Sequence, residues 1–220
     1  MTVGARIHRL HSELPDNIKL LAVSKFHSVE TIREAYNAGQ RRFGENRVQE
    51  LAGKVICLPQ DVEWHFIGHL QANKVKYLVP FVHTIQSVDS RNLLSEINHQ
   101  AEKVGRQIRV LLQIHIAQEA HKFGFSFEEA ETLCQEQLQM LYPYVRIAGL
   151  MGMASLTDDR EQIRREFATL HRFFLQLQER RFSATDFNEL SMGMSDDYQI
   201  AIEEGSTLIR IGSKIFGART

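Results

Sequence analysis

The sequence is poor in the features that define several classes of protein. It contains two cysteines, Cys57 and Cys134, which lie far apart and outside any CxxC pair. This scarcity argues against a disulfide framework and against a zinc site, and it indicates a reducing compartment. No run of about 18 apolar residues occurs, and the first residues do not resemble a signal peptide. We therefore expect no membrane span and a cytoplasmic location.

An excess of charge of either sign is also missing. The chain has 26 basic and 27 acidic side chains, for a net charge of −1. This balance provides no reason to expect nucleic acid or an anionic membrane as a partner. The four prolines fall outside the predicted strand interiors and long helices, and no linker, repeat or low-complexity tract divides the chain. We expect residues 1–220 to form one domain.

What the sequence does contain is a regular alternation of short apolar runs and amphipathic stretches. Val3, Ile7, Leu10 and Leu14 first predict an opening helix. Eight strands are then predicted, each followed by a helix, at residues 20–25, 42–46, 63–68, 84–89, 109–116, 146–153, 187–192 and 207–212. Eight such units in about 200 residues predict a closed (β/α)8 TIM-type barrel with an extra N-terminal helix. A doubly wound open sheet is the alternative.

Capping residues mark several of the predicted helix starts. Ser28 is suited to cap the helix after the first strand, and Ser126 with Glu129 forms a capping box. Asp158 with Glu161 is expected to begin the long helix that follows the sixth strand.

Lys25 stands at the end of the first predicted strand. Leu21 and Val23 share its face by the two-residue period of a strand, so its amine should point into the interior at the strand's carboxyl end. In parallel α/β proteins, that end carries the chemistry. Desolvation there lowers the pKa of an amine and leaves it able to condense with an aldehyde. The alternative is an ordinary strand-end lysine with a solvated head.

Two neighbouring loops are suited to bind an anion. Small residues follow the seventh strand at Ser191–Ser195 and the eighth at Gly212–Lys214, and a helix is expected to begin near Ser195. Barrels often bind phosphate at these positions, although ordinary turns have the same composition. A lysine, a phosphate site and the strand-borne Arg210 together suggest pyridoxal 5′-phosphate (PLP).

Several motifs resemble one known family. Leu21–Lys25, Phe43–Glu50, Trp64–Lys74, Ser191–Ser195 and Arg210–Gly212 resemble the pyridoxal phosphate homeostasis protein family, also called YggS or PROSC, and the resemblance spans nearly the whole chain. It implies a monomeric barrel similar to the N-terminal domain of alanine racemase, with PLP held as a Schiff base. It also implies a role as carrier, buffer or regulator in intracellular PLP homeostasis, with apo PLP enzymes as acceptors and an indirect effect on amino-acid and keto-acid metabolism.

The resemblance also implies roles for individual residues. Lys25 would carry the cofactor, Asn46 would lie beside its ring and Met151 would line the pocket. Ser195, Gly212 and Ser213 would hold the phosphate, and Arg210 would face the pyridine nitrogen. No metal ligand and no catalytic residue is implied. Where the family more often has an asparagine two residues after a glutamine, this chain has His115 after Gln113, near Lys122–Gly124. The fifth-loop contacts and the role of Glu45 therefore stay open.

The arginine bears on the choice between an enzyme and a carrier. A guanidinium keeps its proton and favours a neutral pyridine, which weakens carbanion stabilisation. A racemase also needs a base on each face of the cofactor. In related racemases the resemblance places the second base, a tyrosine, on another domain and subunit, and we expect no such domain in a chain that reaches Thr220 soon after its eighth strand.

We interpret His65, His69 and His83 as scaffold residues rather than bases, and Tyr198 as a packing residue. A non-enzymatic PLP carrier is therefore favoured. A racemase-like PLP enzyme is the alternative, and a Schiff-base aldolase, in which Lys25 attacks a sugar phosphate, is a third and weaker one.

Overall fold

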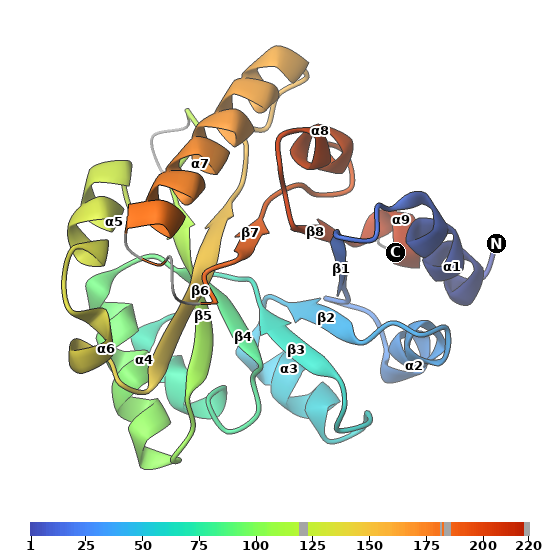
Figure 1. Cartoon of the computed structure of the whole chain (residues 1–220). Helices are drawn as coiled ribbons and strands as arrows, with labels where there is room; N and C mark the ends of the chain where they lie inside the picture. The colour runs from blue at the N-terminus through green and yellow to red at the C-terminus, as the bar shows by residue number, and fades with distance from the viewer. Residues whose placement is uncertain (119–122, 181, 183–185, 218–220) are drawn as a thin grey trace.

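The chain folds into a closed barrel of parallel strands surrounded by helices (Figure 1). This computed structural model describes residues 1–118, 123–180, 182 and 186–217. Each strand pairs with the next along the chain, and β8 pairs with β1, so the predicted barrel is confirmed and the open sheet is wrong. The strands are β1 (Lys19–Val23), β2 (Arg42–Glu45), β3 (Glu63–Phe66), β4 (Thr84–Val88), β5 (Ile108–Ile114), β6 (Val145–Gly152), β7 (Glu189–Ser191) and β8 (Leu208–Ile211).

Helices connect the strands in the order that the hydrophobic pattern predicts. The opening helix α1 packs against α2 and α9, which brings the two ends of the described chain together on one side of the barrel (Figure 1). The helices are α1 (Val3–Glu13), α2 (Val29–Asn37), α3 (Val48–Val55), the 3₁₀ helix η1 (Ala72–Tyr77), α4 (Arg91–Lys103), α5 (Phe127–Cys134), α6 (Leu138–Leu141), α7 (Arg160–Arg180), α8 (Tyr198–Glu203) and α9 (Ser213–Phe216).

The apolar residues form a layer between the strands and the helices. Phe43 and Ile209 on the strands and Leu94 and Phe167 on the helices are fully buried in this layer. A separate small cluster of Leu111, Ala148 and Met151 packs apart from it. Alternate side chains of a barrel strand point into the barrel. The interior positions outside the small apolar cluster can therefore carry polar side chains.

Some predicted boundaries were wrong. The first strand ends at Val23, so Lys25 lies two residues beyond it. Lys25 belongs to a turn that is closed by a hydrogen bond from the His27 N–H to the Ser24 carbonyl at 3.1 Å. The sheet partners explain this end point, because β2 pairs with β1 only at Ala22 and Val23.

Helix caps follow the prediction except at α7. Ser28 and Ser126 accept hydrogen bonds from the backbone of their helices, and Glu129 completes the capping box. Before α7, it is Asp159 rather than Asp158 whose carboxylate accepts the N–H groups of Glu161 and Gln162. A carboxylate one residue closer to the first turn reaches these unpaired N–H groups, which explains the shift.

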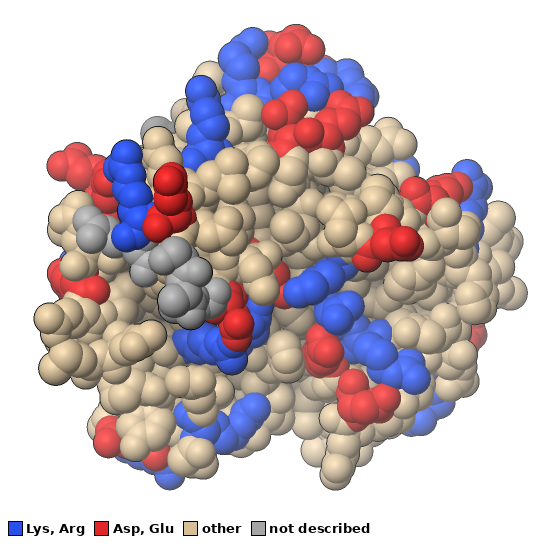
Figure 2. Space-filling model, viewed as in Figure 1, with Lys and Arg blue, Asp and Glu red and all other residues tan. Residues whose placement is uncertain are grey.

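Charges of both signs are interspersed over the visible face of the molecule (Figure 2), as the near-zero net charge leads one to expect. Within the described ranges, no helix combines the length and the apolar composition that a membrane span requires.

Gly149 allows two strands to approach each other closely. It lies in β6 next to an irregularity in the β5–β6 register. A Cβ atom at this position would lie 1.7 Å from the carbonyl oxygen of Glu189 on β7. We therefore expect Gly149→Ala to lower the free energy of unfolding by about 3 kcal/mol, because the backbone must shift to admit a methyl group.

Urea unfolding of the purified variant measures this change. Gly53→Ala is the matched control, because its Cβ would meet no atom within 4 Å and Gly53 lies in helix α3. We expect that control to gain up to about 1 kcal/mol from helix propensity. Equal stability of Gly149→Ala and the wild type would contradict the close approach.

Candidate functional site

The predicted site residues lie at the carboxyl ends of neighbouring strands. Lys25 follows β1, Asn46 directly follows β2, and Met151 is next to the last residue of β6. Ser195 follows β7, Arg210 lies within β8, and Gly212 and Ser213 follow β8. Because β6, β7, β8, β1 and β2 pair in that order, these residues form one contiguous arc of the barrel mouth.

The turn that carries Lys25 has a defined geometry. Lys25 and Phe26 are its two central residues, and Phe26 has a φ of 68°. Among the described non-glycine residues, Phe26 alone has a positive φ, so Lys25 does not share it. A positive φ at the second central position only is the mark of a type II turn. The Lys25 side chain is half-buried at this turn.

The loops after β7 and β8 are in direct contact. The backbone N–H of Gly212 donates to the Ser195 hydroxyl at 3.4 Å. That hydroxyl keeps its own proton to donate, and the first turn of α9 begins at Ser213 with N–H groups that have no partner within the helix. Gly193, with a φ of 92°, lets this loop pass over α8, since a Cβ there would lie 2.6 Å from that of Ala201.

Two expectations for the loop after β7 were wrong. Ser191 belongs to β7 and is fully buried, so it is not part of an exposed anion loop. Helix α8 begins at Tyr198 rather than near Ser195. Asp197 explains the delay, because its carboxylate accepts the Met194 N–H at 2.5 Å and holds residues 194–197 in a turn. Burial raises the pKa of Asp197, although this hydrogen bond opposes the shift.

Arg210 begins a chain of hydrogen bonds inside the barrel. Its Nη1 donates to Ser191 Oγ at 2.6 Å, and its Nη2 donates to the carbonyl of Gly152 at 2.9 Å. The Ser191 hydroxyl donates to Gln86 Oε1 at 2.7 Å, and Gln86 Nε2 lies 2.8 Å from His65 Nδ1. Strands β4 and β7 are not neighbours, so Gln86 and Ser191 meet only across the interior.

The hydrogen bonds of this chain run in one direction, from Arg210 toward His65. Burial lowers the pKa of Arg210 to about 10, so at neutral pH the guanidinium is protonated and can only donate. The Ser191 hydroxyl donates a hydrogen bond to the oxygen of Gln86, so the Gln86 NH₂ group faces His65. His65 Nδ1 accepts, and the ring proton therefore lies on Nε2. Burial lowers the pKa of His65 to about 3, so the ring is neutral.

Sequence reasoning identified Arg210 but missed Ser191, Gln86 and His65 as its partners. They come from three strands that are distant in the sequence, and no local pattern links them. Arg210 Nη2 binds the carbonyl of Gly152, the residue after Met151, so the guanidinium spans from β8 to β6. Met151 itself is buried, with 1% of its surface exposed.

Asn46 and His69 lie after β2 and β3, at the same mouth of the barrel. Asn46 Oδ1 is buried and has no hydrogen-bond partner among the described residues. His69 Nδ1 lies 3.0 Å from Asp89 Oδ2, and its ring stacks on Phe123 at 3.7 Å. These two contacts are consistent with a scaffold role for His69.

Two hydrogen bonds hold the described part of the loop that follows β5. His115 N–H donates to the carbonyl of Phe125, and Gln113 Nε2 donates to the carbonyl of Phe123. Lys122, which belongs to the region where the sequence departs from the family pattern, lies outside the described residues.

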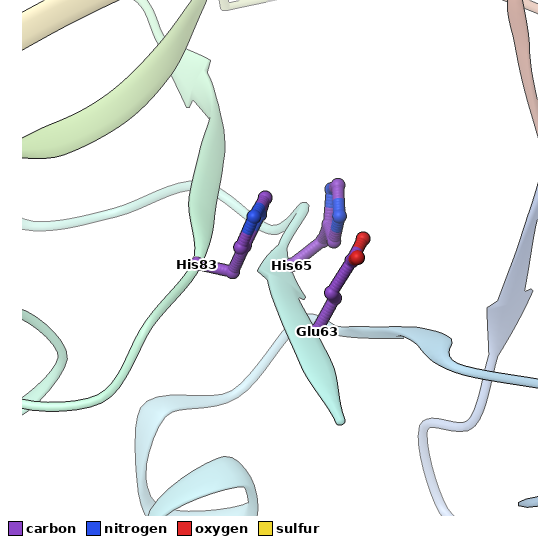
Figure 3. Close-up of side chains that lie close together, drawn as sticks. All are labelled: Glu63, His65 and His83. Carbon is purple, nitrogen blue, oxygen red and sulfur yellow. The ribbon is translucent and has the colours of Figure 1, made fainter. Parts of the chain in front are cut away.

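Glu63, His65 and His83 gather at the opposite mouth of the barrel (Figure 3), with potential ligand atoms within 4.8 Å of one another. Three metal-ligating side chains are thus in reach, but two contacts oppose a metal. Glu63 Oε2 is paired with Arg42 Nε at 2.9 Å. His65 Nδ1 accepts from Gln86, so the ring proton of His65 occupies the other nitrogen, Nε2. His83 precedes β4, so it lies at the wrong end to act on a group held by Lys25.

The comparisons with known proteins agree with this geometry. The chain has the fold of an alanine-racemase-type barrel, and the family described as "Alanine racemase, N-terminal domain" matches residues 2–220. An alanine racemase from Streptomyces lavendulae has a TM-score of 0.79 at 17% identity, covering 99% of this chain and 57% of that one, and shares the fold.

Closer relatives narrow the assignment. "Pyridoxal phosphate homeostasis protein" of Aquifex aeolicus is 42% identical over 202 residues, which is 91% of this chain and 87% of that protein, and that of Schizosaccharomyces pombe is 39% identical over 92% and 85%. The chain belongs to the pyridoxal phosphate homeostasis protein family. The structure of PipY of Synechococcus elongatus with PLP bound has a TM-score of 0.86 at 39% identity, covering 98% of this chain and all of that one.

The direction of the Arg210 chain predicts the state of His65. We expect the imidazole to be neutral with its proton on Nε2 down to pH 5, because its pKa in the folded protein is about 3. Nitrogen chemical shifts from NMR report both the tautomer and the charge. A protonation midpoint near the ordinary value, or a proton on Nδ1, would contradict the assigned direction.

The same shift makes stability depend on pH. The unfolded chain takes up a proton on His65 below about pH 6.5, whereas the folded chain does not, so stability falls as the pH falls toward 3. The contribution approaches about 1.4 kcal/mol per pH unit. Urea unfolding of His65→Gln should therefore show a flatter acid-side slope than the wild type, by about one proton.

Proposed function

We propose that this protein binds PLP as a Schiff base on Lys25 and acts in intracellular PLP homeostasis as a carrier, buffer or regulator. The observation that carries the proposal is the arrangement of Lys25, Ser195, Gly212 and Arg210 at the carboxyl ends of the neighbouring strands β7, β8 and β1. An amine, an anion loop and a guanidinium are the groups that PLP needs. The PLP-bound structure of PipY supports the same reading.

The residues of the mouth fit this cofactor. Lys25 supplies the amine, which condenses with the aldehyde to form a C=N bond and release water. Ser195, Gly212 and Ser213 are proposed to hold the phosphate through hydroxyl and N–H donors, with a hydrogen bond between Ser195 and Gly212 already in place. The unpartnered, buried oxygen of Asn46 offers an acceptor beside the ring. Met151, in the small cluster apart from the main core, is proposed to line the pocket.

Arg210 determines what the bound cofactor is suited to do. Bound PLP supplies an aldehyde for covalent attachment and an aromatic ring that can draw electrons from a substrate. Two hydrogen bonds, to Ser191 and Gly152, hold the guanidinium inside the barrel. A protonated guanidinium offers the pyridine nitrogen a donor but no acid strong enough to protonate it, so electron withdrawal by the ring is weak. This supports holding the cofactor over transforming a substrate.

Neither His69 nor His83 is placed to act as the second base that a racemase needs. His69 is paired with Asp89 and stacked on Phe123, and His83 lies at the other end of the barrel. The relatives reported above are named as homeostasis proteins rather than as enzymes. We therefore propose that the protein binds PLP without acting as an enzyme. A racemase-like activity is the alternative, and experiment can test it.

Four further features belong to this proposal. The chain acts as one domain and as a monomer, it is located in the cytoplasm, and apo PLP enzymes accept the cofactor from it. The continuous barrel supports the first of these.

Covalent binding at Lys25 is tested directly. Addition of PLP to the purified protein should shift the cofactor's absorbance to that of an internal Schiff base, and borohydride reduction should fix the adduct on Lys25 in a peptide map. Lys25→Ala should lose the shift and the adduct, because no other amine occupies this turn. Lys76→Ala, which removes an exposed lysine of η1, is the matched control and should keep both. An adduct on another lysine would contradict the assignment.

Turnover is tested by isotope exchange. We expect the PLP-loaded protein to exchange the α-proton of single L-amino acids in deuterated water no faster than free PLP, because neither His69 nor His83 is placed to act as an opposing base. Proton NMR follows the exchange over time. Sustained exchange at a rate above that of free PLP would favour the racemase-like alternative and contradict the carrier proposal.

A further inference from the structure

A buried cluster of charged side chains lies on the helix-facing side of the Lys25 turn. We call Glu45, Glu50 and Lys54 the Lys54 cluster. Lys54 Nζ is 2.8 Å from Glu45 Oε1, 2.6 Å from Glu50 Oε1 and 2.9 Å from the Ser24 carbonyl oxygen. An ammonium has three protons to donate, so this set of acceptors satisfies it fully. The side chains of Lys54 and Glu45 are 7% and 0% exposed.

The cluster binds the backbone on both sides of Lys25. The Ser24 hydroxyl donates to Glu45 Oε1 at 2.5 Å, and Lys54 holds the Ser24 carbonyl. The Phe26 N–H donates to Glu50 Oε1 at 2.6 Å. The residues immediately before and after Lys25 are therefore tied to α3 and to the end of β2.

The turn needs such support because its second central residue is unfavourable. A φ of 68° suits glycine or asparagine, whereas this chain has Phe26. Phe26 is 50% exposed, with the Arg47 guanidinium 4.9 Å from the ring centre, so deep burial in the core does not impose the conformation. The short bond from its N–H to Glu50 acts directly on the strained residue.

The charges in the cluster are costly for the fold. Burial raises the pKa of Glu45, although hydrogen bonds from Lys54 and Ser24 oppose the shift. Burial also acts to raise the pKa of Glu50, but the hydrogen bonds from Lys54 and Phe26 outweigh it and hold that pKa below its ordinary value. Buried ion pairs are often no more stabilising than apolar residues of the same size. A role in orienting the turn accounts for charged groups at this position.

We infer that the Lys54 cluster positions the Lys25 turn so that the lysine amine meets the aldehyde of PLP. This inference rests on the proposed function. Lys54, Glu45 and Glu50 act through Ser24 and Phe26, so they are positioning residues. This inference also gives a role to Glu45, for whose carboxylate the sequence alone indicates no partner.

The test separates Schiff-base formation from binding of the phosphate and ring. Lys54→Met removes the ammonium and keeps most of the side chain's length. We expect its dissociation constant for PLP to rise about tenfold, in line with the loss of hydrogen bonds to a charged group, and Schiff-base formation to slow. Pyridoxine 5′-phosphate has no aldehyde, so its affinity should be the same for Lys54→Met and the wild type.

Lys19→Met is the matched control. Lys19 lies at the other end of β1 and pairs with the buried carboxylate of Glu189 at 2.7 Å, so its loss also breaks a partly buried ion pair. Both variants should lose stability in urea, but only Lys54→Met should lose PLP affinity. Phe26→Gly added to Lys54→Met should restore much of that affinity, because glycine adopts the positive φ without support.

Each outcome is decisive. If Lys54→Met does not fold, Glu50→Ala replaces it, since this variant removes the acceptor of the Phe26 N–H and leaves the Lys54–Glu45 pair. Unchanged PLP affinity and rate in a folded variant of either kind would overturn the inference. Equal losses for PLP and for pyridoxine 5′-phosphate would also overturn it, by showing a general structural effect. A wild type that forms no Schiff base would instead refute the proposed function.

Discussion

The pairing of β8 with β1 is the constraint on which the rest of the structure depends. Lys19 to Ala22 align with Leu208 to Ile211, so the two ends of the chain are joined in one continuous sheet. This closure places the Lys25 turn beside Gly212 and Ser213, which lie almost at the other end of the sequence. Without it, the amine and the proposed anion loop would occupy opposite edges of an open sheet. A cofactor that needs both groups at once would then have no site.

Two buried polar networks flank this mouth, one on each side of the barrel wall. The chain from Arg210 through Ser191 and Gln86 to His65 runs across the interior, and it begins at a permanent donor. The Lys54 cluster lies on the outer side, between β2 and α3, and holds the backbone around Lys25. Buried polar groups need partners, and in both networks those partners connect elements that are distant in the sequence. Both networks therefore orient the groups proposed to meet the cofactor.

The sequence predicted the architecture well because the signals for it are local. Apolar runs with helical stretches between them identify the strands and helices, and caps such as Ser28 and Ser126 depend on residues only three positions away. Strand ends were less certain, since pairing with a neighbour decides them, as at Val23. Motifs that resemble a known family indicated Lys25 and Arg210 as site residues. Their contacts were beyond reach, because Gln86 and Ser191 meet Arg210 only after the barrel has closed.

The sequence by itself determined the alternation of strands and helices, the lysine near the carboxyl end of the first strand and the small residues after the last two strands. These features follow from residue type and short-range spacing, which the chain carries before it folds. The tertiary structure alone decided that Lys25 occupies a type II turn, that Ser191 serves Arg210 rather than an anion, and that Glu45 and Lys54 meet. The physical reason is that each of these depends on hydrogen bonds between separate elements, whose geometry is defined only when the sheet is closed and the helices have packed against it.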